Sequence, residues 1–142
     1  MPCEAIYEPD WRSGKHVPTR FTAADGGTLS VAGIWQAWKS PEGEWTNSFA
    51  MITVNADDHP LMREYHRSDP KRPPDQQDKR MMVILPDDAI EAWLDAPVER
   101  SFDFMRQFPA ERLVVTPEPV VTAAKKAKAA RAVRDQGGKT KE

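Results

Sequence analysis

Several features that would place this protein in a specialised class are missing from its 142 residues. It has a single cysteine, Cys3, so it cannot form an internal disulfide. No apolar run approaches the roughly 18 residues that a membrane-spanning helix needs. The opening residues, Met1-Pro2-Cys3-Glu4, lack the basic and apolar regions of a signal peptide. We therefore expect a cytoplasmic protein that has no membrane partner.

Sequence motifs of the common cofactor and hydrolase classes are also missing. The chain contains no Gly-rich phosphate loop, no set of Cys and His residues at zinc-binding spacing, and no Gly-x-Ser-x-Gly nucleophile elbow. We accordingly expect no metal and no organic cofactor. Composition and pattern alone do not indicate an enzyme class.

Charge is present in quantity but is distributed unevenly. The net charge is −2, yet residues 120–142 hold seven Lys/Arg and two Asp/Glu, a net +5, which leaves −7 on the rest of the chain. The basic segment is rich in Ala and Lys and has almost no apolar face, which predicts a frayed helix or a disordered tail. It either binds polyanions or is a solvated extension, the commoner fate of a charge run. We expect one domain over residues 1–119 and a basic tail over 120–142.

The 13 prolines argue against long helices and favour short elements joined by turns. Strands are predicted over residues 3–8, 16–21, 29–38, 48–54, 81–85 and 113–116, and short helices over 57–65, from Asp87 onward, and over 99–106. Residues 48–54 are the most apolar run and predict a buried, central strand. Asp25-Gly26-Gly27 predicts a hairpin turn, and residues 67–78, with three prolines and no apolar side chain, predict an exposed loop. The expected fold class is α+β, dominated by strands.

Four segments, in order, resemble the SOS response-associated peptidase (SRAP) family. They are the block from Pro2 to Trp11 (Pro-Cys-Glu-Ala-Ile-Tyr-Glu-Pro-Asp-Trp), Val31-Ala-Gly-Ile-Trp35, Phe49 to His66, and Lys79-Arg-Met-Met-Val-Ile-Leu85 followed by Trp93-Leu94. Single pieces are weak signals, but four in the family's order over residues 2 to about 119 are fairly specific.

The resemblance implies a function in DNA repair. SRAP proteins capture the aldehyde of an abasic site in single-stranded DNA with an N-terminal cysteine, forming a covalent thiazolidine, and a glutamate and a histidine assist. Carried over to this sequence, the glutamate is Glu8, the histidine is His66, and Arg80 would contact DNA phosphate. A histidine and a carboxylate suit the proton transfers of imine formation, and the forked donors of arginine suit phosphate.

The sequence departs from the family in two places. It starts just before the glutamate block, so we expect an N-terminally truncated domain that lacks the nucleophilic cysteine and has uncertain enzymatic activity. Cys3 is a poor substitute, because Pro2 precedes it and a thiazolidine needs the amine and the thiol on one residue. Fourteen positions separate His66 from Arg80, more than in the family, so His59 is the alternative histidine.

Three hypotheses about function remain open. The chain processes abasic sites, alone or with a complementing N-terminal fragment; or it is an inactive remnant that binds single-stranded DNA through Arg80, the basic tail and aromatic faces; or it is a partner-binding module that uses open strand edges. Each site residue also has a structural reading: Glu8 as a solvated carboxylate, His66 as a residue at a helix end, and Arg80 as a surface ion-pair partner.

Overall fold

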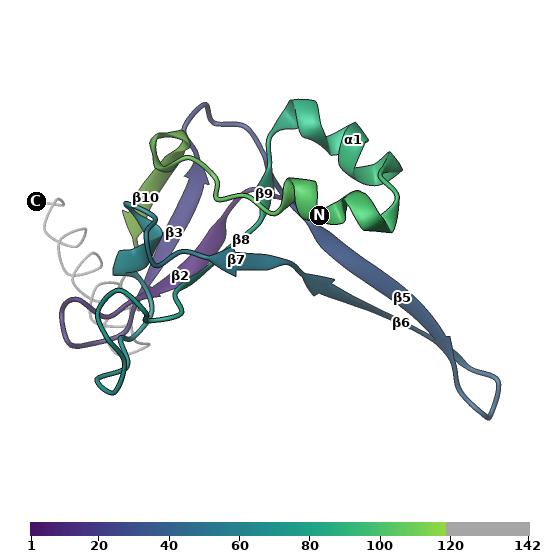
Figure 1. Ribbon diagram of the computed structural model, residues 1–142, viewed down its shortest axis with the longest axis horizontal. Coiled ribbons are helices and arrows are strands. Elements are labelled where there is room, and N and C mark those ends of the chain that lie inside the picture. The colour runs from purple at the N-terminus through teal and green to yellow at the C-terminus, as the bar shows by residue number, and fades with distance from the viewer. Residues whose placement is uncertain (119–142) are drawn as a thin grey trace, which may run out of the picture.

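The computed structural model describes residues 1–118, so the predicted basic tail lies outside the described residues. The strands are β1 (Pro2–Cys3), β2 (Ile6–Asp10), β3 (Val17–Ala23), β4 (Leu29–Val31), β5 (Gly33–Lys39), β6 (Trp45–Met51), β7 (Thr53–Asn55), β8 (Arg80–Met82), β9 (Ile84–Leu85) and β10 (Leu113–Pro117). The helices are α1 (Ile90–Asp95) and the 3-10 turns η1 (Met62–Glu64), η2 (Asp87–Ala89), η3 (Val98–Phe104) and η4 (Ala110–Arg112). The fold is α+β and rich in strands, as predicted (Figure 1).

The strands form four small antiparallel sheets, ordered β1-β4-β9, β10-β3-β2, β5-β6 and β7-β8. Three of these sheets meet where their strands are interrupted, at Ala32, Ile52 and Val83. The Ala32 N–H donates to Val83 O, the Val83 N–H to Ile52 O, and the Ile52 N–H to Ala32 O, at 2.8, 2.9 and 3.0 Å. The three residues thus close a ring of hydrogen bonds, and the β4-β9, β5-β6 and β7-β8 pairs leave it in different directions.

The main core lies between the β10-β3-β2 sheet and side chains from β4, β8, β9 and η1. Its buried apolar side chains are Ile6, Phe21, Leu29, Val31, Ala56, Met62, Tyr65, Met81, Ile84, Phe108 and Leu113. Phe21 of the central strand β3 packs edge-to-face on Tyr65, with ring centroids 4.8 Å apart, a favourable aromatic geometry. Strand β2 is an edge of this sheet, and its residues alternate between buried and exposed, so Glu8 points inward.

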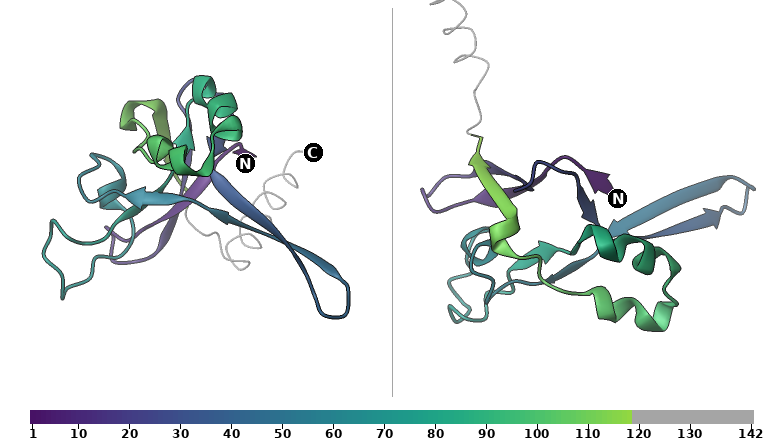
Figure 2. Two further views of the ribbon diagram at one scale, coloured as in Figure 1. Left: turned by 45° about the vertical axis from the view of Figure 1, so that its right-hand side comes forward. Right: turned by 90° about the horizontal axis from the view of Figure 1, so that it is seen from above.

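The hairpin of β5 and β6 contradicts one prediction. Residues 48–54 were expected to form a buried, central strand, but every residue of β6 is exposed, and within residues 1–118 this strand pairs only with β5. The hairpin projects away from the body in all three views (Figures 1 and 2). The prediction failed because an apolar run indicates only that a strand is suited to burial. Among the described residues, none packs over β6 to bury it.

The strand predicted over residues 29–38 is divided at Ala32 into β4 and β5. The reason is that the N–H and C=O groups of Ala32 form hydrogen bonds with Val83 and Ile52, which belong to two different segments, rather than with one neighbouring strand. The turn at Asp25-Gly26-Gly27 forms, with Gly26 at φ +77°. It does not close a hairpin, because β3 and β4 belong to different sheets.

The helix expected over residues 57–65 is reduced to one 3-10 turn, η1, and neither Asp57 nor Asp58 caps it. The N-cap residue is Leu61, and the backbone N–H groups of Leu61 and Met62 donate to His59 Nδ1. Asp57 instead accepts the backbone N–H groups of Asp78 and Lys79, tying the end of the long loop back to the body.

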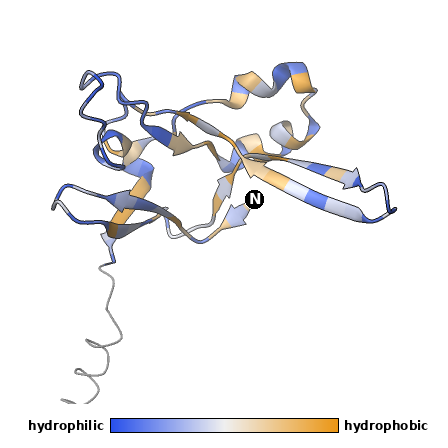
Figure 3. Ribbon diagram, turned by 90° about the horizontal axis from the view of Figure 1, so that it is seen from below, coloured by the Kyte–Doolittle hydropathy of each residue, from blue (hydrophilic) through white to orange (hydrophobic). Residues whose placement is uncertain are grey.

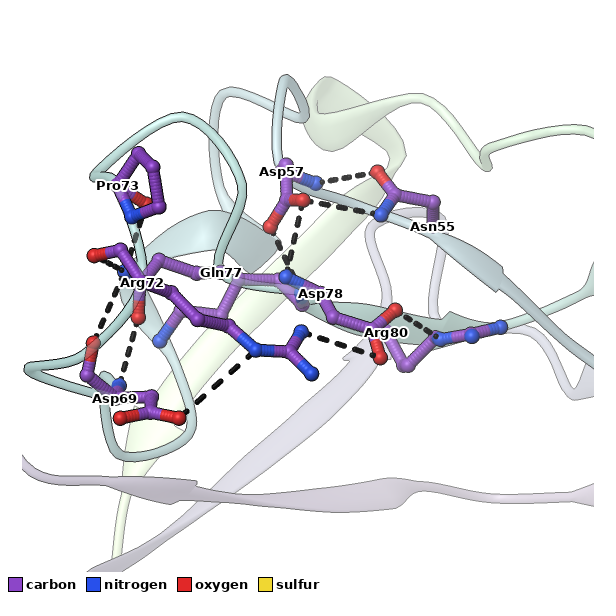
Figure 4. Close-up of polar contacts among 9 residues, drawn as sticks. Asn55, Asp57, Asp69, Arg72, Pro73, Gln77, Asp78 and Arg80 are labelled. Carbon is purple, nitrogen blue, oxygen red and sulfur yellow. Dashed lines mark hydrogen bonds and ion pairs between the residues drawn. The ribbon is translucent and has the colours of Figure 1, made fainter.

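The loop over residues 67–78 is exposed, as predicted, and it is folded on itself (Figure 4). The Gln77 side-chain amide donates to the carbonyl oxygens of Asp69, Arg72 and Pro73 and accepts the Asp69 N–H. One glutamine side chain therefore ties three positions of the loop together.

Candidate functional site

Glu8 and His66, distant in the sequence, meet at the outer edge of strand β2. His66 Nε2 lies 2.8 Å from Glu8 Oε2. Glu8 is only 6% exposed, whereas the His66 side chain is about two-fifths exposed. A buried carboxylate that holds a solvent-facing imidazole is an arrangement that fixes the ring and lets its outer face exchange protons.

The backbone around His66 is specially shaped to make this contact. His66 has φ +62°, in the left-handed region that non-glycine residues seldom adopt. Its N–H donates to Pro9 O at 2.9 Å, so the segment adds to the free edge of β2 one residue beyond Glu8. Such a conformation persists only where surrounding contacts enforce it.

Lys79 supplies much of that enforcement. It is 6% exposed, and its Nζ donates to the carbonyl oxygens of Tyr65 and His66, both at 2.8 Å, and to Ser68 Oγ at 3.3 Å. Burial lowers the pKa of the Lys79 ammonium. A buried ammonium is retained when its donors are satisfied, and here its acceptors lie on both sides of the histidine.

A cleft of about 490 Å³ opens beside His66. Its walls come from the turn after β2 and from η1 with the segment that follows it. Its lining is rich in arginine: Trp11, Arg12, Gly14, Arg63, Glu64, His66, Arg67 and Ser68. The Arg67 guanidinium lies over the Trp11 ring, 5.7 Å from its centroid. Three guanidinium groups, one indole and one imidazole form a surface suited to phosphates and bases.

Arg12 is held in place by a buried acid. Its Nη2 and Nε contact both oxygens of Asp10, at 2.7 to 3.2 Å, and its guanidinium stacks on Tyr65 with Cζ 5.2 Å from the ring centroid. The hydrogen bond from Arg12 lowers the pKa of Asp10 and raises that of Arg12, while burial raises the pKa of Tyr65. The guanidinium at the cleft wall is therefore oriented before any ligand arrives.

The structure separates the other predicted residues from this cluster. Arg80, on β8, is exposed and pairs with Asp78 Oδ1 at 2.9 Å (Figure 4), and it does not line the cleft. His59 is buried and fully bonded, with Nε2 2.8 Å from Phe108 O. Cys3 is half-buried in β1, and its nitrogen belongs to a peptide bond.

Sequence reasoning missed the arginine-lined wall and Lys79. The spacing of Arg63 and Arg67, four positions apart on either side of His66, was an available signal. Lys79 offered none, because a lysine next to Arg80 is ordinarily exposed. Among residues 1–118 no three His, Cys, Asp or Glu side chains are grouped to hold a metal ion, and no helix is long and apolar enough to cross a membrane.

Comparisons with known proteins show which family and which solved structures this chain is similar to. A family model described as "SOS response associated peptidase (SRAP)" matches residues 1–125. A crystal structure from Bordetella bronchiseptica is similar at 50% identity and a TM-score of 0.76, over 84% of this chain and 54% of that one. A second, from Bacteroides thetaiotaomicron, shares the fold at 20% identity and a TM-score of 0.68, over 85% of this chain and 49% of that one. This chain thus spans about half the length of either structure. A comparison with curated proteins gave no significant match.

Proposed function

Because this chain belongs to the SOS response-associated peptidase family, we propose that it acts in processing abasic sites in single-stranded DNA, with Glu8 and His66 as its acid–base pair. Membership assigns it a role associated with DNA damage. The observation that carries the finer proposal is the 2.8 Å contact between His66 Nε2 and Glu8 Oε2 beside an arginine-lined cleft.

The proposed chemistry divides between this chain and a complementing N-terminal segment. That segment supplies the cysteine whose amine and thiol add to the ring-opened aldehyde: the amine forms an imine with loss of water, and the thiol closes the thiazolidine. His66, held by Glu8, transfers the protons that these steps need. Arg12, Arg63 and Arg67 bind the flanking phosphates as cations with forked donors.

A second candidate, non-covalent binding of single-stranded DNA, is favoured by the cleft itself. Trp11 contributes an indole ring to the cleft, with the Arg67 guanidinium over one face, and the combination of aromatic rings and arginines is typical of single-strand binders. Arg80 would then serve as a peripheral phosphate contact, as its exposure on β8 allows.

The test uses single-stranded DNA of one sequence, with and without a single abasic site. We expect the 142-residue chain alone to bind both in a native gel, with affinity that falls as salt rises, and to leave no adduct on a denaturing gel. Co-expressed with the part of the Bordetella bronchiseptica relative that it does not match, it should give an adduct on the abasic strand only.

Two substitutions identify the acid–base pair. Glu8→Gln and His66→Asn should slow adduct formation by roughly 100-fold or more, the usual contribution of general acid–base catalysis, while leaving native-gel binding nearly unchanged. Asparagine suits position 66 because it tolerates the left-handed backbone. Undiminished adduct formation in both variants would refute their role, and an absence of any DNA binding by the wild type would refute both candidate functions.

A further inference from the structure

The hairpin of β5 and β6 presents an aromatic surface with no partner among residues 1–118. Its strands pair Trp35 with Phe49 and Lys39 with Trp45, so these side chains share one face. Trp35 and Phe49 are 77% and 70% exposed. Single exposed apolar residues are ordinary, but a contiguous cluster of this kind marks an interaction site.

This surface continues into a groove on the body of the domain. A hollow of about 420 Å³ runs from the base of the hairpin to helix α1. Its lining is almost entirely apolar and includes Met1, Ile34, Trp35, Phe49, Trp93 and Leu94. The base of the hairpin is correspondingly hydrophobic in Figure 3. Leu94 of α1 is 70% exposed along this groove.

The backbone of the hairpin is also available. Within the described part of the chain, β5 and β6 each pair on one side only, so their outer edges carry free N–H and C=O groups. Open edges beside an apolar face are the features that an added strand uses. A suitable partner therefore contains extended segments with apolar side chains at alternate positions.

The charge of the hairpin argues against nucleic acid as this partner. Residues 33–51 contain one lysine and two glutamates, a net charge of −1. Binding to a phosphate backbone depends on Lys and Arg, and the arginines instead line the separate cleft beside His66. The two surfaces therefore have different chemistry and different ligands.

The comparison with solved structures indicates which polypeptide fits. Roughly half of each similar structure has no counterpart in this chain, although the matched half superimposes well. We propose that the β5–β6 hairpin and the adjoining groove are the docking surface for the polypeptide that forms the remaining half of the SRAP domain, whether it is joined to this chain or separate. An interface of this kind resembles a domain core cut in half, which is the character of obligate interfaces.

The experiment co-expresses the 142-residue chain with the unmatched part of the Bordetella bronchiseptica relative, and purifies through a tag on that part. We expect a 1:1 complex and a blue shift of tryptophan emission on assembly. Trp35→Ser combined with Phe49→Ser should weaken the complex by about tenfold or more, as loss of central aromatic anchors does. Phe102→Ser, which removes an aromatic side chain 82% exposed on η3 and outside the groove, should leave it unchanged.

Circular dichroism establishes that each variant folds, and no DNA is present, so failure of the DNA chemistry would not affect this result. The proposal is overturned if the double variant binds as the wild type does, or if the folded wild type captures no partner. It is equally overturned if the double substitution abolishes a homodimer of the chain alone or, in a separate native gel, the binding of single-stranded DNA, since the occupant is then a second copy or nucleic acid.

Discussion

Two histidines seven positions apart occupy opposite environments at the residue scale. His59 is 2% exposed, and both of its ring nitrogens bond to backbone groups, whereas His66 faces solvent with Nε2 on Glu8. The family resemblance predicted His66 as the functional histidine, with His59 as the alternative. The sequence alone did not indicate which of the two side chains is buried. Only the three-dimensional contacts show which imidazole has a free side.

This contrast predicts that substitutions at the two histidines lower the free energy of unfolding by different amounts. His59→Ala should destabilise the domain by at least about 2 kcal/mol, because Phe108 O and the N–H groups of Leu61 and Met62 lose their partner in a buried place. His66→Asn should cost less, about 1 kcal/mol, because the side chain is partly exposed and an asparagine amide can still donate to the buried Glu8 carboxylate. Urea unfolding followed by tryptophan fluorescence measures both. Equal destabilisation by the two substitutions would contradict this assignment.

Lys79 is the residue that holds the site without belonging to the cleft. Lys79→Met should cost about 1 to 3 kcal/mol, because the carbonyl oxygens of Tyr65 and His66 are left unpaired. It should also release the left-handed backbone at His66 and reduce adduct formation more than DNA binding. Arg80→Met, at the next position and exposed, is the matched control for stability. A Lys79→Met domain with wild-type stability would show that the three hydrogen bonds contribute nothing.

At the element scale, local pattern predicted most strands and their approximate bounds, but not which of them are covered. Residues 81–85 and 48–54 are both apolar runs, yet residues 81–85 are largely buried, whereas residues 48–51 lie in the exposed β5–β6 hairpin. The two segments differ in what packs against them, and that depends on parts of the fold distant in sequence. The helix predicted over residues 57–65 is shortened to a 3-10 turn, and the N–H groups at its start bond to His59 rather than to an aspartate.

Gly33 fixes where the hairpin joins the body. A Cβ at this position would lie 2.9 Å from Ala50 O, in the partner strand, which is closer than real contacts allow. Gly33→Ala should therefore push the strands apart and cost about 1 to 3 kcal/mol, with faster amide hydrogen exchange along β5. Gln36→Ala, an exposed change in the same strand, should leave exchange unaltered. Unchanged exchange in Gly33→Ala would mean that the base of the hairpin already yields.

For the whole molecule, two carboxylates make the free energy of unfolding depend on pH in the acidic range. The hydrogen bond from Arg12 keeps the pKa of Asp10 below its ordinary value of 3.8, and the Lys79 backbone N–H does the same for Asp57. Both carboxylates stabilise the fold fully above that pH. Their contribution is lost as the pH falls through 3.8 toward the lower folded values, because protonation breaks the bonds.

We therefore expect the free energy of unfolding to decrease between about pH 5 and pH 2.5. Asp57→Asn should be less stable at pH 6 and should show a shallower decline, because one titrating group is gone. Asp95→Asn, at the end of α1, is the matched control. Urea unfolding across this pH range measures the effect, and an identical slope in Asp57→Asn and the wild type would contradict it.

The ring of hydrogen bonds among Ala32, Ile52 and Val83 bears on how such a domain tolerates change in length. Each of these residues donates through its N–H and accepts through its C=O, so the three hydrogen bonds among them fix the point where the strands cross. Residues can be inserted or deleted at the far end of an arm, as at the tip around Gly43, without displacing the other two arms. One hairpin of the domain can thus become longer during evolution while Glu8 and His66 keep their separation. Homologous domains can then share the geometry of the site although their overall shapes differ.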